Sequence, residues 1–232
     1  MLISWKKFEI LTKPYSRSIG YWAFRTWYAK LWKRKPGNPP YNHVVQIGDP
    51  RLRVKCSPIP VEDIKSNEIQ YLIKHLKHVL KRYDCVGLSA PQIGVDLQVF
   101  VMELSKKQLK DFSESEIKSK DVKVFPLTVV INPSVKIVDF NKIVFSESCE
   151  SVKGFCGDVP RYKSIELTGY NENGENLKME ANGWLARIIQ HETDHLNGKI
   201  YTDIMSKDTL ACSCWEAVNE NRGKVVLPYS PD

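Results

Sequence analysis

Two stretches of the chain repeat apolar residues at the spacing of an α-helix. Residues 61–84 do so with Ile69, Leu72, Ile73, Leu76, Val79, Leu80 and Tyr83. Residues 182–198 do so with Leu185, Ile188, Ile189 and Leu196. Side chains three and four positions apart share one helix face, so both stretches are predicted to be amphipathic helices. Asn182 is a suitable N-cap for the second helix, and Asn197-Gly198 is a suitable stop.

The segments between these helices favour extended structure. Residues 97–104 are predicted to form a strand, residues 127–140 one or two strands turning at Asn132-Pro133, and residues 164–181 a hairpin with its turn at 171–174. Residues 105–125 are charged and Ser-rich, which predicts an exposed loop. We therefore expect an α+β domain, in which antiparallel strands pack around helix 182–198, with helix 61–84 as a further amphipathic helix.

Composition divides the chain into a basic leader and a nearly neutral body. At 232 residues and 42% apolar, the chain is long enough for one packed domain with extensions. Residues 1–35 carry nine Lys or Arg against Glu9, a net charge of +8, which leaves −1 for the other 197 residues of a chain with net charge +7. The body therefore gives no reason to expect nucleic-acid binding.

The leader is poor in acids and rich in Trp, Tyr and Phe. It contains no apolar run near the ~18 residues that span a bilayer. Three interpretations remain: a mitochondrial or plastid transit peptide, a membrane-surface amphipathic segment, or a basic arm for RNA. Composition favours a transit peptide over residues 1–38. The KPGNPP stretch at 35–40 then precedes a folded domain over 39–210, which is followed by a tail over 211–232.

Six cysteines show no closely repeated framework, and no secretory signal precedes them. Reduced thiols are therefore expected, most of them as small buried side chains, with one available as a metal ligand. His75 and His78 lie among lysines without an acidic or thiol companion, so we expect them at the surface.

The sequence HETDH at 191–195 contains the strongest chemical signal. His191 and His195 lie four positions apart on one helix face and can reach one ion, while Glu192 beside them can act as a base toward a metal-bound water. A solvated helix face is the alternative. It is disfavoured because the histidines flank the apolar stripe, and burying them unpartnered would cost several kcal/mol each. The third ligand stays open between a downstream acid, as in zinc proteases, and an upstream cysteine.

Three segments together resemble the peptide deformylase family: CVGLSAPQIG at 85–94, ESCESV at 147–152 and QHETDHLNG at 190–198. The similarity runs from about Val44 to Met205 and includes the charged insertion of the mitochondrial type. The resemblance implies the site residue by residue. The metal ligands would be Cys149, His191 and His195, the general acid/base Glu192, the oxyanion donors Gln92 and the N–H of Glu150, and the peptide-binding wall would include Gly87.

The resemblance also implies an activity and a location. We expect a hydrolase that holds one divalent ion, Fe²⁺ or Zn²⁺, and removes the formyl group from formyl-methionine on nascent peptides in the mitochondrial matrix, releasing formate. The mitochondrial ribosome is a further candidate partner. The alternative is a catalytically weakened metal-binding paralogue that serves as a ribosome or assembly factor.

Three positions depart from the family motifs. Cys85 and Ser148 replace glycines, and Glu150 replaces an apolar residue. A glycine beside a ligand often has positive φ, so Ser148 is expected either to store backbone strain there or to shift the loop to avoid it. Glu150 would place a carboxylate near the methionine side chain.

Overall fold

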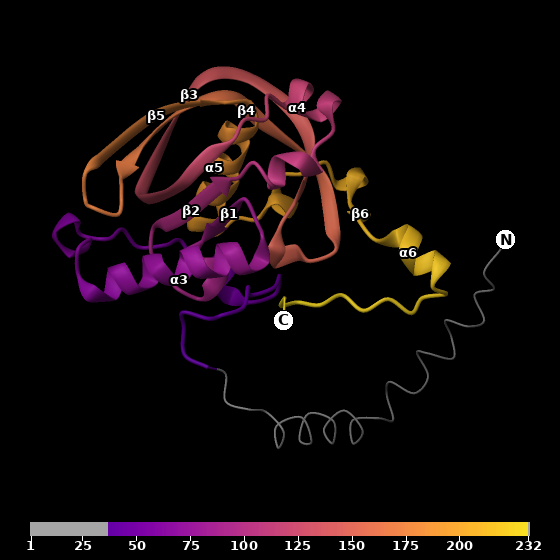
Figure 1. Ribbon diagram of the computed structural model, residues 1–232, viewed down its shortest axis with the longest axis horizontal. Coiled ribbons are helices and arrows are strands. Elements are labelled where there is room, and N and C mark those ends of the chain that lie inside the picture. The colour runs from indigo at the N-terminus through magenta and orange to yellow at the C-terminus, as the bar shows by residue number, and fades with distance from the viewer. Residues whose placement is uncertain (1–36, 232) are drawn as a thin grey trace. The chain divides into compact units, whose positions relative to one another are not determined.

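The computed structural model describes residues 37–231, and residues 39 onward form one compact unit. The predicted transit peptide therefore lies almost wholly outside the described residues. A strongly curved sheet wraps around helix α5 (Gly183–Leu196), and helix α3 (Asn67–Tyr83) crosses its open side (Figure 1). The predicted fold class, antiparallel strands around a central helix with one further amphipathic helix, is confirmed.

The sheet is antiparallel throughout, with order β1-β2-β3-β4-β5 and β6 paired to β4. Its strands are β1 Gly87–Ser89, β2 Val99–Leu104, β3 Phe125–Ser148, β4 Phe155–Tyr170, β5 Asn176–Asn182 and β6 Ala211–Cys212. The remaining helices are α4 Glu114–Lys120 and α6 Trp215–Glu220. Short 3-10 turns are η1 Pro50–Arg53, η2 Val61–Asp63, η3 Ala90–Ile93, η4 Gln108–Asp111, η5 Glu150–Val152, η6 Tyr201–Asp203 and η7 Lys207–Thr209. Among the strands of the described residues, β1 pairs only with β2, and its other edge faces no strand of this set.

The apolar stripes seen in the sequence become two buried clusters. Leu72, Leu76 and Leu80 of α3 pack against β1 and β2. Ile189 and Leu196 of α5 pack against the inner face of the curved sheet, beside Phe100 and Ile165. Burying such side chains stabilises the fold by about 1.5–3 kcal/mol each. This packing fixes α5, and with it the HETDH segment, along the axis of the sheet.

The ends of α5 lie where the sequence predicted them. Asn182 occupies the N-cap position in an extended conformation, although its side chain makes no capping hydrogen bond. Asn197 ends the helix, and Gly198 follows at φ +71°, a left-handed conformation that favours glycine. Helix α3 begins later than the predicted residue 61, because the Ser66 side chain caps it by accepting from Ile69 N–H.

Two local predictions were wrong. Residues 105–125 are not simply an exposed loop: they contain η4 and α4, and Ser113 and Glu116 form a capping box that starts α4. Nor does the chain turn back at Asn132-Pro133. β3 continues through a bulge there, with Asn132 at φ +50° and its side-chain amide bonded to both backbone groups of Ile59.

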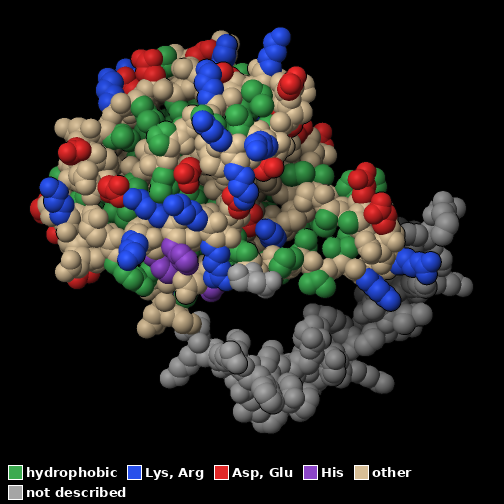
Figure 2. Space-filling model, viewed as in Figure 1, with side chains coloured by type: hydrophobic (Ala, Val, Ile, Leu, Met, Phe, Trp, Pro, Cys, Tyr) green, Lys and Arg blue, Asp and Glu red, His purple; other side chains and the backbone are tan. Residues whose placement is uncertain are grey.

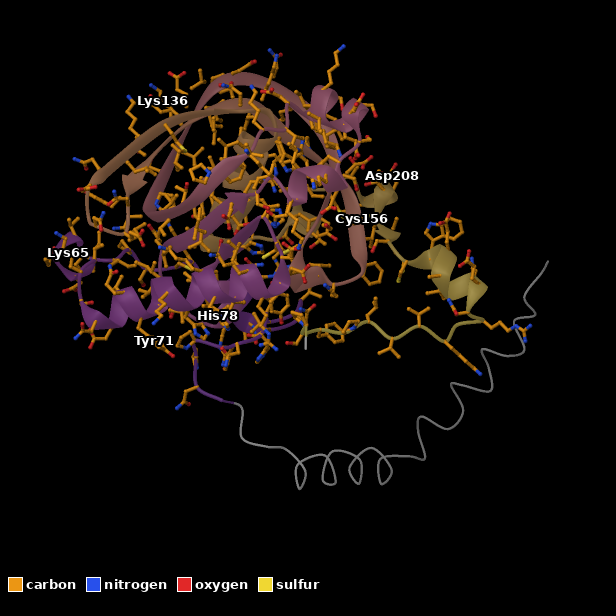
Figure 3. All side chains as sticks on the ribbon, viewed as in Figure 1. Lys65, Tyr71, His78, Lys136, Cys156 and Asp208 are labelled. Carbon is orange, nitrogen blue, oxygen red and sulfur yellow. The ribbon has the colours of Figure 1, made fainter. Side chains whose placement is uncertain are left out.

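The distribution of charged side chains on the surface agrees with the small net charge of residues 36–232. Basic and acidic side chains are mixed over the face seen in Figure 2. His78 is exposed on the outer side of α3, as expected (Figure 3). His75 is half-buried, and its Nε2 hydrogen-bonds the Tyr41 carbonyl at 2.9 Å. Among the described residues, no helix combines the length and the apolar character needed to cross a bilayer.

Candidate metal centre and active site

Three side chains from two elements converge at the middle of the molecule. His191 and His195 lie on α5, and Cys149 lies at the turn after β3, where it caps η5. Their potential ligand atoms all lie within 4.8 Å of one another, and Cys149 Sγ is 3.3 Å from His195 Nε2. His195 is 1% exposed and Cys149 is 9% exposed. Of the two options for a third ligand, the structure brings the upstream cysteine beside the histidines.

A second layer of charged residues holds His191 in place. Glu147 accepts a hydrogen bond from His191 Nδ1 at 3.0 Å, which turns the Nε2 atom of the ring toward the cluster. Glu147 also pairs bidentately with Arg161, at 2.9 Å for each bond, and with Arg187 at 2.7 Å. Arg161 in turn pairs with Asp194 at 2.5 Å. Such carboxylate–histidine pairs fix the ring orientation of metal ligands.

The surroundings of the two histidine rings favour a positive charge on His191 rather than on His195. Burial opposes a charged His191 ring, but the hydrogen bonds and negative charges of Cys149 and Glu147 outweigh it and hold the His191 pKa well above its ordinary value. Burial, together with His191, lowers the pKa of His195 well below its ordinary value. Burial also opposes ionisation of Glu147, yet hydrogen bonds from His191 and Arg161 hold the pKa of Glu147 well below its usual range. A metal cation between Cys149 and the two rings would also be stabilised by Cys149 and Glu147, the groups that favour a positive charge on His191.

The donor set fits a divalent transition-metal ion. A thiolate and two imidazoles suit both zinc and ferrous iron, and three protein ligands leave a coordination position open. Burial of His195 keeps that ring neutral, which is the form that binds a metal. Cys149, His191 and His195 are therefore the residues that would hold the ion.

Glu192 is positioned by a serine and by a glycine. Its side chain is 3% exposed and accepts a hydrogen bond from Ser89 Oγ at Oε2, at 2.5 Å. Oε1 faces Gly87, where an added β-carbon would overlap it. Burial raises the pKa of Glu192, so its carboxylate is a better proton acceptor than an exposed one. Both Gly87 and Glu192 line the cavity beside the cluster.

Gln92 and Glu150 flank the same cavity. The Gln92 amide is 2% exposed, and its Nε2 lies 3.2 Å from Ser151 Oγ and 3.6 Å from Cys149 Sγ. Its Oε1 accepts from Ser89 N–H at 2.8 Å, which fixes the amide with its donors toward the cluster. The Glu150 carboxylate pairs with Lys153 at 2.8 Å, so its charge is partly balanced.

Stored backbone strain, the first of the two outcomes expected at Ser148, is not observed. Ser148 is not among the described residues with positive φ. It is the exposed last residue of β3 and pairs with Cys156 of β4, whose place in the sheet is marked in Figure 3. Extended backbone of this kind accepts any L-residue. No strain is therefore stored before Cys149.

All seven site residues named from the sequence lie together, yet several supporting residues were missed. Ser89, Glu147, Arg161 and Arg187 drew no prediction. Glu147 could have been found, because it precedes Cys149 by two positions and shares its strand face. Arg187 precedes His191 by four positions on one helix face. Arg161 gave no local signal, because only sheet pairing brings it to Glu147.

The curved antiparallel sheet, its central helix and a thiolate–imidazole cluster with an adjacent carboxylate define a metal-dependent hydrolase. Comparison with known proteins makes this specific. The family model for polypeptide deformylase matches residues 41–210. The chain belongs to this family, whose members are metal-dependent enzymes.

Individual relatives support the same family assignment. The chain is 40% identical to the mitochondrial peptide deformylase of Homo sapiens over 185 residues, which cover 80% of this chain and 76% of the human protein. It is 39% identical to the chloroplastic peptide deformylase 1A of Solanum lycopersicum, covering 79% of this chain and 65% of that protein. A Synechococcus elongatus peptide deformylase crystallised with actinonin superposes with a TM-score of 0.59 at 28% identity, covering 83% and 92% of the two chains.

Proposed function

We propose that this protein hydrolyses the N-terminal formyl group of formyl-methionyl peptides newly made in the mitochondrion, releasing formate and a free amine. The observation that carries the proposal is the convergence of Cys149, His191 and His195 with Glu192 beside them, next to a cavity of about 280 Å³. The relatives are named as peptide deformylases, which supports the same activity.

When bound, a divalent ion supplies Lewis-acid activation of water and of the formyl carbonyl. Glu192 takes the proton of the attacking water at Oε1, because Ser89 already occupies Oε2. Glu192 then delivers this proton to the departing amine nitrogen. The Gln92 amide and the N–H of Glu150 donate hydrogen bonds to the oxyanion of the tetrahedral intermediate, where one good donor contributes about 3 kcal/mol.

The peptide is held beside the free edge of β1. An extended chain can add to such an edge through backbone hydrogen bonds, and Gly87 leaves room for close approach. The cavity is also lined by Trp184 and Ile188, which suit the apolar thioether of methionine. Hydrolysis thus needs both an extended N-terminus and an unbranched apolar first side chain.

The physiological ion is ferrous iron or zinc, since both accept this donor set. Residues 1–38 form a mitochondrial transit peptide, residues 39–210 the catalytic domain and residues 211–232 a tail, with the matrix as the destination. The human relative is a mitochondrial protein, which supports this location. The nascent chain brings the enzyme to the mitochondrial ribosome. The convergence of Cys149, His191 and His195 supports the active enzyme over the catalytically weakened paralogue.

The direct test is formate release from formyl-Met-Ala-Ser by protein purified anaerobically and loaded with Fe²⁺ or, separately, Zn²⁺. The matched control is Glu192→Gln, which preserves shape but cannot take up the proton. Formate from the wild-type protein and its loss in the variant are expected. Absence of formate from the fully loaded wild-type protein would contradict the proposal.

A further inference from the structure

Two cysteines of the C-terminal segment lie in contact with each other outside the metal centre. Cys212 is the last residue of β6, and Cys214 is the N-cap residue of α6, so a single serine separates them. Their sulfur atoms lie 3.4 Å apart, and both side chains are half-buried free thiols. Figure 1 shows β6 and α6 in succession along the yellow part of the chain.

Backbone contacts hold this pair of thiols on both sides. Cys212 belongs to β6, which pairs with β4, and the next residue, Ser213, donates its N–H to the Gly154 carbonyl at 2.9 Å. On the other side, the Cys214 carbonyl accepts from the Val218 N–H at 3.0 Å, the first turn of α6. The fold therefore keeps the two sulfur atoms together, and a bond between them needs side-chain rotation rather than a rearrangement of the sheet.

The other four cysteines are placed differently. Cys56 is 3% exposed, and burial raises its pKa to about 12. Burial also raises the pKa of Cys85 well above its ordinary value. Cys149 is 9% exposed and belongs to the metal cluster. Cys156 is half-buried in β4. All six cysteines lie in the described part of the chain, and within it only Cys212 and Cys214 form a thiol–thiol contact.

We propose that Cys212 and Cys214 form a reversible dithiol–disulfide site, which a small-molecule disulfide such as glutathione disulfide oxidises while Cys149 stays reduced. The thiolate of one cysteine attacks a sulfur of glutathione disulfide, whose S–S bond breaks, and one glutathione thiolate leaves. The second cysteine gives up its proton and attacks the protein sulfur of this mixed disulfide, and the second glutathione thiolate leaves. The protein loses two electrons and two protons, and glutathione disulfide becomes two glutathione thiols.

The contact between the two sulfur atoms favours the internal disulfide over a lasting glutathione adduct. The second attack is intramolecular, so it is faster than attack by another glutathione molecule from solution. Because both side chains are half-buried rather than enclosed, a reducing thiol can reach the bond and reopen it. The bond would join the end of β6 to the start of α6 and involves no ligand of the metal cluster. The site is thus independent of the proposed hydrolysis.

The experiment uses the full chain loaded with one equivalent of Zn²⁺ and incubated with glutathione disulfide. The remaining thiols are alkylated, and tryptic peptides are measured by mass spectrometry. Both cysteines fall on the peptide 208–222, because Lys207 and Arg222 precede the cleavage sites. We expect this peptide to be lighter by two hydrogen atoms than the reduced peptide and to carry no glutathione. Treatment with excess reduced glutathione should restore two thiols.

Cys212→Ser and Cys214→Ser each leave one thiol without its neighbour, so the mixed disulfide with glutathione should accumulate there, at least about tenfold above its level in the wild type. Cys156→Ser is the matched control, since it removes a half-buried thiol of the adjacent strand, and it should form the internal disulfide as the wild type does. A wild-type peptide 208–222 that keeps both thiols, carries glutathione or is linked to another cysteine would overturn the inference. Release of zinc during the oxidation would overturn it too, because Cys149 would then have reacted.

Discussion

Gly87 lies so close to Glu192 that no other residue fits between β1 and α5 at this point. A β-carbon built on Gly87 would overlap Glu192 Oε1 and lie 2.8 Å from Cδ. The Glu192 side chain cannot easily move away, because hydrogen bonds with Ser89 and the packing of α5 hold it in place. The glycine is therefore required by the position of the Glu192 carboxylate.

Gly87→Ala should lower kcat/KM on formyl-Met peptides about 10- to 100-fold, because overpacking of about 1–3 kcal/mol would displace Glu192. Bound metal, measured by elemental analysis, should stay near one ion per chain. Full activity of Gly87→Ala would mean that the carboxylate can move without loss.

Glu192→Gln should reduce turnover by about 10²–10⁴-fold, because the amide cannot accept the proton of the attacking water. The metal content should be nearly unchanged, since Glu192 is not a ligand. Steady-state kinetics and metal analysis on the same sample check both statements. Turnover near that of the wild type at full metal occupancy would remove Glu192 from the mechanism.

Cys149→Ala and His195→Ala should each abolish stoichiometric metal binding, because one thiolate and two imidazoles make up the only three-ligand cluster in the described part of the chain. Cys156→Ala is the matched control: Cys156 is a free thiol nearby in β4 that is not part of that cluster. Metal lost from Cys156→Ala and kept by Cys149→Ala would show that the ligand assignment is wrong.

Glu147→Ala should lower the free energy of unfolding by about 3–5 kcal/mol, because Arg161 and Arg187 would be left buried without their shared partner. It should also weaken metal affinity about 10- to 100-fold, since His191 loses its orienting hydrogen bond. Urea unfolding and competition with a chelator measure the two effects. Glu166→Ala, at a surface ion pair in which Lys178 is exposed and Glu166 half-buried, should change neither quantity appreciably.

Residues 1–40 fused to a fluorescent reporter should direct it to mitochondria. Replacing the Lys and Arg residues of 6–35 by Glu should leave the reporter in the cytosol, because import depends on the positive charge of the leader. Microscopy with a mitochondrial dye distinguishes the outcomes. A reporter that decorates membranes generally would favour a membrane-surface segment instead.

Local sequence signals were sufficient where a contact lies within one element. His191 and His195 lie four positions apart on α5, so their shared face follows from helical geometry alone, and Glu192 directly follows the first of them. The N- and C-terminal boundaries of α5 also followed from Asn182 and from Asn197-Gly198, because capping depends on nearby backbone groups. The role of Cys149 came from a resemblance between motifs, since its distance from His195 in the chain is 46 residues.

Only the tertiary structure decided the contacts that depend on sheet pairing and on turns. Arg161 reaches Glu147 because β3 and β4 pair with a particular register, which local periodicity does not encode. Ser148 has extended rather than left-handed backbone for the same reason. The sequence by itself determined helix α5 with its two histidines and the antiparallel α+β class. The fold determined which buried charges support His191 and why position 87 must be glycine.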